Sequence, residues 1–186
     1  IDIMSYKQLA YGAKRYLDGP ARWALTGAAA AFTDPLYSPG SDFIAIENDF
    51  IADLIRRDLA GEDIAERSQA YDGFLKYRFD TTMLLYRDLY RTLGSYDLFG
   101  LKWDFDIGCY YNLWLEPYMR DAHLDLRWVN TELGRRRLVT GVLSSFRDLF
   151  LHVQDALERD GRFHANNLDA FTGDFPTMHC AEALGS

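Results

Sequence analysis

The chain has 186 residues, of which 48% are hydrophobic and 15% aromatic, and its formal net charge at pH 7 is −8. This apolar content is sufficient for one compact core and argues against an intrinsically disordered chain. The negative charge argues against nucleic acid and against an anionic membrane surface as partners.

No stretch approaches the roughly 20 apolar residues of a membrane span, and no signal peptide is present, so a cytoplasmic location is expected. The two cysteines, Cys109 and Cys180, are too few for a disulfide framework and lack the closely spaced companions of a zinc site. We therefore expect no metal. The chain begins at Ile1, within a segment that reads as a strand, which suggests a processed or truncated product.

Extended structure is expected at the beginning of the chain. Residues 1–12 have mixed polarity and no helix cap, so they are predicted to be extended. Residues 13–21 contain an Asp-Gly-Pro turn signal. Residues 22–26 form a short apolar run that stops at Gly27, which predicts a buried strand.

Residues 27–42 contain four alanines after a glycine, and then two prolines and a glycine within six residues. A helical turn is predicted at 28–31, whereas Pro35 and Pro39 prevent a long helix and stiffen the loop. Free amides at the two helix starts on either side of this loop would suit a planar or polyanionic ligand. The alternative is a tight strand-to-helix connection in which the alanines only pack.

A first helix is predicted to begin at Ser41 or Asp42, which can cap it, and to end near Leu59, before Gly61. Its predicted apolar face consists of Phe43, Ile46, Phe50, Leu54 and Ile55.

A second, longer helix is predicted from Asp63, which can cap it, to Gly94. Its apolar positions are Ala70, Phe74, Tyr77, Leu84, Leu85 and Leu89. Residues 102–116 are predicted to form a mostly buried helix that ends before Pro117.

Residues 118–130 are expected to form a short helix or connector, and 131–159 another long helix. The sequence therefore predicts a mainly α fold with a small β element, an α+β arrangement rather than a doubly wound sheet. We divide it into a strand-loop-helix segment over 1–61, a helical region over 62–160 and a tail over 161–186.

One segment, RWALTGAAAAFTDPLYSPGSDF, resembles the third FAD-binding motif of flavin monooxygenases and tryptophan-halogenase-like enzymes. In that motif a strand leads into Gly-Asp-Ala-Ala, an aromatic residue, Asp-Pro-Leu, and Ser-x-Gly at the head of a helix. The matching residues are Gly27, Ala29, Ala30, Phe32, Asp34, Pro35, Leu36, Ser38 and Gly40.

The resemblance implies the C-terminal, largely helical part of an FAD-dependent oxidoreductase, of the dehydrogenase or monooxygenase-like kind. Its loop would lie along the ribityl chain and the isoalloxazine ring, and its helices would cover a small-molecule or carrier-tethered substrate. No catalytic residue can be assigned. The cofactor-binding residues implied are Gly27, Ala28, Asp34, Pro35, Ser38, Pro39, Gly40 and Ser41.

Three departures from the family pattern bear on the cofactor and halide binding that the resemblance implies. The acidic residue after the motif's first glycine is Ala28 here, which removes one hydrogen bond to the ribityl chain. A Thr-Gly pair that holds halide in related halogenases is Pro39-Gly40, so one amide donor is absent. No G-x-G-x-x-G of a Rossmann βαβ unit is present. This chain alone is therefore expected to be inactive, with its N-terminal dinucleotide-binding half missing.

Two further questions stay open at the level of sequence. The chain could instead be a non-enzymatic helical interaction module that has lost cofactor binding. An acidic and aromatic cluster could line a substrate pocket or belong to a core helix with exposed acids. Its members are Trp103, Asp104, Asp106, Tyr110, Tyr111 and Trp114.

Overall fold

A computed structural model describes residues 9–167, which form a mainly helical fold with two small antiparallel sheets. β1 (Tyr11–Gly12) pairs with β4 (Ala31–Phe32), and β2 (Leu17–Asp18) pairs with β3 (Trp23–Ala24). The predicted mainly α fold with a small β element is confirmed. All strand pairing within the described residues is antiparallel, so this part of the chain holds no βαβ unit.

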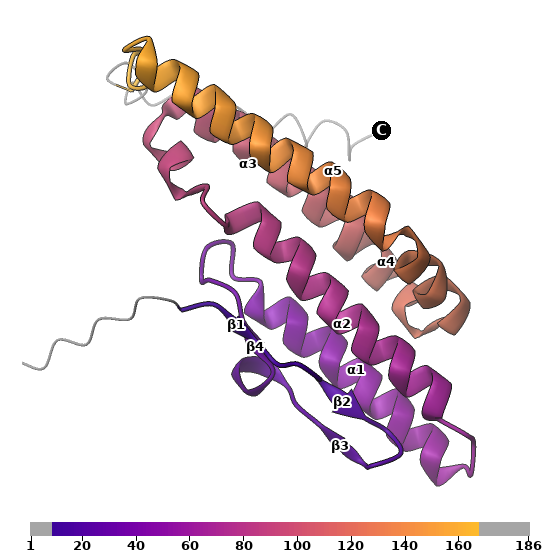
Figure 1. The fold of residues 1–186 in the computed structure, drawn as a ribbon. Helices are drawn as coiled ribbons and strands as arrows, with labels where there is room; N and C mark the ends of the chain where they lie inside the picture. Colours follow the sequence, from indigo (N-terminus) through magenta and orange to yellow (C-terminus); the bar gives the residue numbers. More distant parts are fainter. Residues whose placement is uncertain (1–8, 168–186) are drawn as a thin grey trace, which may run out of the picture.

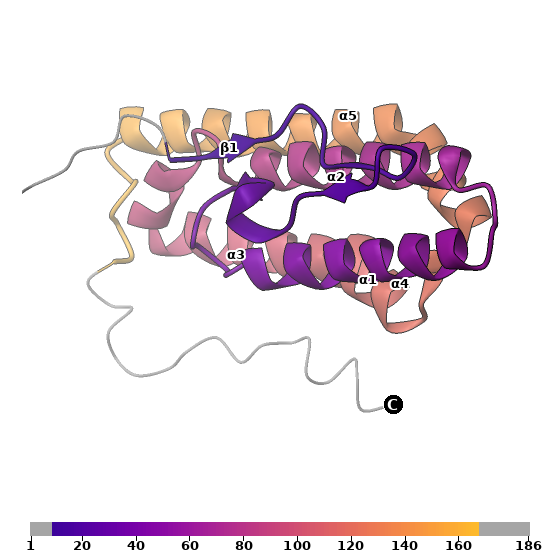
Figure 2. The ribbon, with the colours of Figure 1, turned by 90° about the horizontal axis from the view of Figure 1, so that it is seen from below.

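The helices form two groups, one of α1 and α2 and the other of α3, α4 and α5. Figure 1 shows α1 and α2 side by side, with the strands along one side of this pair and α3, α4 and α5 along the other. Figure 2 gives the same arrangement from below, with the strands across α1 and α2. Among the described residues, no helix combines the length and apolarity needed to cross a membrane. The α-helices are α1 (Gly40–Leu59), α2 (Ala65–Tyr86), α3 (Tyr96–Tyr110), α4 (Glu116–Met119) and α5 (Leu126–Arg159).

Four short helical turns connect these elements. Three are 3-10 turns and one is a π-helical turn between α3 and α4. The 3-10 turns are η1 (Gly27–Ala29), η2 (Tyr90–Gly94) and η4 (Ala122–Leu124), and the π-helical turn is η3 (Tyr111–Leu115).

The apolar face of α1 is confirmed at four of its five predicted positions. Phe43, Ile46, Phe50 and Leu54 are buried, whereas Ile55 is 55% exposed. Ile55 follows Leu54 directly, so it is rotated by about 100° from the buried stripe and lies at its edge.

A proline lies at the beginning of α1, and a glycine follows its end. Its N-cap is Pro39, with no side-chain hydrogen bond, so the predicted cap at Ser41 or Asp42 is wrong. Proline suits this place because its φ of −69° is already helical and its missing N–H needs no intrahelical acceptor. The predicted end before Gly61 is confirmed, and Gly61 takes a φ of +78°.

The second helix ends eight residues earlier than predicted. α2 stops at Tyr86, because Asp88 adopts a left-handed conformation with a φ of +67°, and Gly94 closes the following turn η2 instead. The sequence did not mark Asp88 as a helix end, because such ends are usually recognised by a glycine. Aspartate can also adopt the left-handed conformation. At the other end, Asp63 accepts a hydrogen bond from the amide of Ala65 at 3.0 Å.

The third helical segment differs from its prediction at both ends. α3 begins at Tyr96, capped by Ser95, and helical structure continues through Pro117 into α4. The π-helical turn η3 precedes Pro117, which lies in the first turn of α4, where a missing N–H disrupts little. The segment is also less buried than predicted. Over 102–117 the buried residues are Lys102, Asp106, Trp114 and Pro117.

The last helix, α5, begins five residues before the predicted 131, because Asp125 accepts a hydrogen bond from the amide of Arg127 at 2.9 Å. Its predicted end before Gly161 is confirmed. Much of its apolar surface is exposed rather than packed. The exposed apolar residues are Leu138, Val142, Phe146, Leu149 and Val153.

The predicted strand over 22–26 is shorter and more exposed than expected. Only Trp23–Ala24 pair as a strand, and Trp23 is 40% exposed because it lies on the outer strand of the hairpin. The inner strand attaches to α2, where Asp72 accepts from the amide of Tyr16 at 2.6 Å and Ser68 from that of Gly19 at 2.7 Å. Of the extended segment expected over 1–12 and the tail expected over 161–186, residues 1–8 and 168–186 lie outside the described residues.

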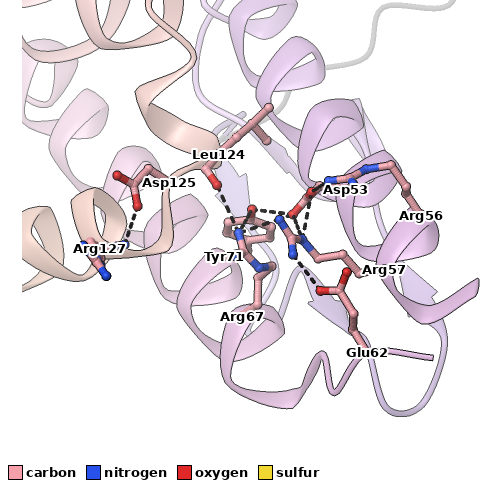
Figure 3. Close-up of polar contacts among 9 residues, drawn as sticks. All are labelled: Asp53, Arg56, Arg57, Glu62, Arg67, Tyr71, Leu124, Asp125 and Arg127. Carbon is pink, nitrogen blue, oxygen red and sulfur yellow. Dashed lines mark hydrogen bonds and ion pairs between the residues drawn. The ribbon is translucent and has the colours of Figure 1, made fainter. Parts of the chain in front are cut away.

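A buried carboxylate joins α1, α2 and the segment before α5 (Figure 3). Asp53 accepts hydrogen bonds from Tyr71 at 2.8 Å, from Arg56 at 2.6 Å and from Arg57 at 3.0 Å. Arg67 contacts the same carboxylate at 3.4 Å and also donates to the carbonyl of Leu124 at 3.0 Å. The network therefore links α1 and α2 to the segment that precedes α5.

Replacing Asp53 by asparagine is expected to lower the free energy of unfolding by about 2 kcal/mol, because charge-assisted hydrogen bonds are lost. Burial acts to raise the pKa of Asp53, but hydrogen bonds from Tyr71, Arg57 and Arg56 outweigh it and lower that pKa. Its stabilising contribution is thus complete above the unfolded-state pKa and is lost as pH falls through the folded-state pKa.

Urea denaturation at several pH values would check both points. The difference between the wild type and Asp53→Asn should shrink on acidification. Asp58→Asn, which removes an exposed pair with Arg22, should cost at most about 1 kcal/mol. A difference that stays constant down to pH values below the folded-state pKa would contradict this account.

Candidate functional site

Seven of the eight residues predicted to bind a cofactor line one groove. The groove has a volume of about 310 Å³, a size typical of small-molecule sites, and lies between η1, β4 and the beginning of α1. Pro39, the eighth, is the N-cap of α1 and does not line it. The seven are Gly27, Ala28, Asp34, Pro35, Ser38, Gly40 and Ser41.

The N-terminus of α1 supplies hydrogen-bond donors at this groove. Its first backbone hydrogen bond runs from the amide of Phe43 to the carbonyl of Pro39, at 3.1 Å. Within the described residues, the amides of Gly40, Ser41 and Asp42 therefore have no backbone acceptor. The positive end of the helix dipole adds to their attraction for an acceptor or an anion.

The other expected donor site, at the first glycine of the motif, is already occupied. Glu47 of α1 accepts from the amide of Gly27 at 2.7 Å and from the hydroxyl of Thr26 at 3.1 Å. Burial raises the pKa of Glu47, and these two hydrogen bonds oppose the rise. Sequence reasoning missed this residue, although a charged side chain four positions after Phe43 on the apolar stripe of α1 was a usable signal.

Gly27 is required for conformational and steric reasons. It has a φ of +59°, and a Cβ added there would lie 3.3 Å from the side chain of Ile44. The turn η1 is consequently held close against α1, and Gly27 and Ile44 both line the groove.

The loop between β4 and α1 is held by its own hydrogen bonds. Asp34 accepts from the amide of Leu36 at 2.8 Å, and the carbonyl of Pro35 accepts from the amide of Ser38 at 2.9 Å. Tyr37 and Ser38 both adopt left-handed conformations, with φ values of +63° and +53°. The carboxylate of Asp34 is therefore engaged within the loop.

Three aromatic side chains fix the underside of this loop. The hydroxyl of Tyr86 donates to the carbonyl of Leu36 at 2.9 Å. The ring of Tyr37 lies 6.0 Å from that of Tyr86 and packs edge-on against Trp103, with 5.3 Å between centroids. The loop is thus anchored to α2 and α3.

A buried ion pair lies below these rings. Lys102 donates to Asp106 and to the carbonyl of Leu85 at 2.9 Å, and both charged side chains are almost fully buried. Burial raises the pKa of Asp106, whereas Lys102 and the nearby hydroxyl of Tyr37 act in the opposite direction. Burial lowers the pKa of Lys102. The loop therefore rests on a charged pair that water does not reach.

The fold places the members of the acidic and aromatic cluster, Trp103 to Trp114, in three different environments. Trp103 and Asp106 support the loop, Asp104 and Tyr111 are exposed, and Tyr110 and Trp114 line a second cavity with Arg78. Neither the pocket nor the core-helix interpretation holds for the whole cluster, because a helix directs residues of one segment to several faces.

His123 is buried, with its Nε2 2.9 Å from the carboxylate of Asp49. The two residues lie 74 positions apart in the sequence, so their spacing did not indicate this contact. Within the described part of the chain, no three histidine, cysteine or carboxylate side chains are grouped as a metal site.

Comparison with known proteins supports a distant relationship. The chain is 26% identical over 126 residues to the flavin-dependent halogenase chlA of Dictyostelium discoideum. The match covers 67% of this chain and 21% of the halogenase, so the chain spans about a fifth of that relative's length. No family model and no solved structure matches the chain. The similarity supports a halogenase-like relationship and a flavin cofactor in the parent family.

Proposed function

We propose that this chain forms the flavin-ring side of the cofactor site in an FAD-dependent oxidoreductase of the dehydrogenase or monooxygenase-like kind. The observation that carries the proposal is the groove at the N-terminus of α1. There seven of the eight predicted cofactor-binding residues lie beside the N-terminal amides of α1, which have no backbone acceptor. The similarity to a flavin-dependent halogenase supports it independently.

The donors of the groove fit one end of a flavin. A bound flavin supplies the oxidation and reduction chemistry, and negative charge develops at the pyrimidine edge of its ring on reduction. The amides of Gly40, Ser41 and Asp42 would stabilise this charge, because they are fixed donors at a helix N-terminus. Ala28 offers no carboxylate to the ribityl chain, and Pro39 offers no N–H to a halide. Halogenation is therefore the less favoured activity.

Other parts of the enzyme belong to the proposal as well. An N-terminal dinucleotide-binding half would hold the ADP portion of FAD, since the groove would take only the ring side. A small-molecule or carrier-tethered substrate would lie against the helices that follow the loop.

A second candidate function rests on α5. Five apolar side chains of this helix are between 36% and 65% exposed, which is more than a helix packed on one face requires. The chain would then be a helical interaction module without cofactor. Analytical size-exclusion chromatography, together with a flavin titration, separates the two: a monodisperse chain that takes up no flavin favours the module.

The flavin proposal is tested by changing Ala28, which lines the groove. In the full-length polypeptide, Ala28→Asp is expected to tighten FAD binding by about 10- to 100-fold. It would restore a charge-assisted hydrogen bond worth about 1.5–3 kcal/mol. Ala28→Trp should abolish binding by filling the groove. Ala29→Trp is the matched control, because Ala29 is also exposed but does not line the groove.

Flavin absorbance and fluorescence during the titration report the affinities. Absence of flavin uptake by the full-length wild type, or an equal effect of the two tryptophan substitutions, would refute this function.

A further inference from the structure

A stripe of exposed apolar side chains follows α5 along much of its length. These side chains recur every three or four positions, so they share one face of the helix. The buried positions of α5, among them Val139, Leu143 and Phe150, lie on a neighbouring face that packs against the rest of the molecule. The exposed set, called the α5 stripe below, consists of Leu138, Val142, Phe146, Leu149 and Val153.

The α5 stripe borders an apolar groove between α5 and α3. The groove has a volume of about 420 Å³, and Leu138 and Val142 line it together with Phe105 of α3, among others. Phe105 also stacks on Phe146, with 4.4 Å between ring centroids. A helix that lay along the stripe could insert its own apolar side chains into this groove, as ridges pack into grooves between helices.

Opposite charges lie at the two ends of the α5 stripe. Arg135 precedes Leu138 by three positions, and Asp160 follows Val153 by seven, which is close to two helical turns. Both residues are exposed, and both lie on the same face as the stripe. Arg135 contacts Glu132 through one nitrogen, at 2.7 Å, and a guanidinium has several further donors. The stripe therefore has a basic end and an acidic end.

This pattern is complementary to a second copy of itself that runs in the opposite direction. A two-fold axis at the level of residues 147 and 148 brings each stripe residue opposite an apolar residue of the other copy, and each basic end opposite an acidic end. A parallel pair would instead bring like charges together at both ends, which is unfavourable. In the antiparallel pair, the facing residues are Arg135 with Asp160, Leu138 with Leu157, Val142 with Val153, and Phe146 with Leu149.

The α5 stripe lies away from the side of the molecule that holds the flavin groove. Figure 1 shows α5 on the opposite side of α2 from the strands. The flavin groove lies on the strand side, between η1, β4 and the beginning of α1. A dinucleotide-binding half that completes the flavin site would therefore meet the strand side and leave the stripe available to another molecule.

We propose that α5 is a dimerisation surface, at which two copies of the protein pair antiparallel about a two-fold axis. The apolar stripe and the groove beside it are then covered, and an Arg135–Asp160 ion pair forms at each end. The contact extends over roughly 37 Å of helix, which places it at the lower end of stable interfaces, so the dimer is concentration-dependent. The proposal names the partner for the surface on which the second candidate function rests, and it is independent of flavin binding.

Sedimentation equilibrium of the full-length polypeptide tests the surface. The wild type should show a monomer–dimer equilibrium. Leu149→Glu should abolish the dimer, because it places a charge near the centre of the apolar stripe. Leu59→Glu is the matched control, because Leu59 is an exposed apolar residue of α1 outside the stripe, and it should leave the equilibrium unchanged. Circular dichroism should show that both variants remain folded.

Exchanging the charges at the two ends tests the antiparallel orientation. Arg135→Glu and Asp160→Arg should each weaken the dimer about tenfold or more, because like charges then meet at both ends. An equimolar mixture of the two variants should associate about as tightly as the wild type, because the mixed pair again has opposite charges at each end.

Three results would overturn the proposal. A monomer at every concentration up to about 1 mM would indicate that another segment of the polypeptide or a different protein covers the stripe. Equal losses in Leu149→Glu and Leu59→Glu would place the contact elsewhere. A mixture that associates no more tightly than the separate variants would exclude the antiparallel pairing. Absence of flavin uptake with the dimer retained would refute the flavin function alone.

Discussion

Replacing Lys102 by methionine is expected to lower the free energy of unfolding by about 3–5 kcal/mol, because it leaves the buried carboxylate of Asp106 without its cation. Methionine preserves most of the side-chain volume, so the loss isolates the charge. Urea denaturation at neutral pH would measure it. The double variant Lys102→Met with Asp106→Leu should recover most of the loss, since both charges are removed together.

The pH dependence of the Lys102→Met variant provides a second measurement. Burial already raises the folded-state pKa of Asp106, and removing Lys102 removes the main opposing influence. A carboxyl group with a raised folded-state pKa destabilises the fold above that pKa. The cost disappears as pH falls below its unfolded-state value. The deficit of the variant should therefore shrink in acid. A deficit of less than about 1 kcal/mol at neutral pH would show that the pair contributes little.

Replacing Phe50 by alanine is expected to lower the free energy of unfolding by about 3–5 kcal/mol. Phe50 is fully buried and stacks on Tyr71 with 3.8 Å between centroids and 5° between ring planes. It also packs edge-on against Phe74. Alanine would remove these contacts and leave a cavity where α1 meets α2.

Ile55→Ala is the matched control, because it lies one turn further along α1 and is 55% exposed. It should change the free energy of unfolding by no more than about 0.5 kcal/mol. Thermal or urea denaturation of both variants would check the comparison. Similar losses in the two variants would show that the face of α1 toward α2 is not the packed one.

The N-terminus of α1 is the element on which the proposed flavin site depends. On one side its free amides and the preceding loop form the flavin groove. On the other, Asp42 faces the cavity of Arg78. Because the loop rests on Tyr86 and on the Lys102–Asp106 pair, a change at that pair is expected to weaken flavin binding as well as stability.

The sequence by itself determined the features that depend on local rules. The 3.6-residue repeat of Phe43, Ile46, Phe50 and Leu54 predicted a helix and its buried face. Gly61 and Gly161 marked helix ends, because positive φ favours glycine there. The spacing of the motif residues predicted a shared site, and the fold brings seven of the eight predicted cofactor-binding residues to one groove.

Only the tertiary structure decided the pairings between distant segments. Asp53 with Arg67, Glu47 with Gly27, and Asp42 opposite Arg78 are each separated by 14 or more positions in sequence. Their energies depend on burial and on which helix faces meet, and neither quantity is encoded in a local pattern. No local pattern therefore indicates that these charged residues lie inside the fold.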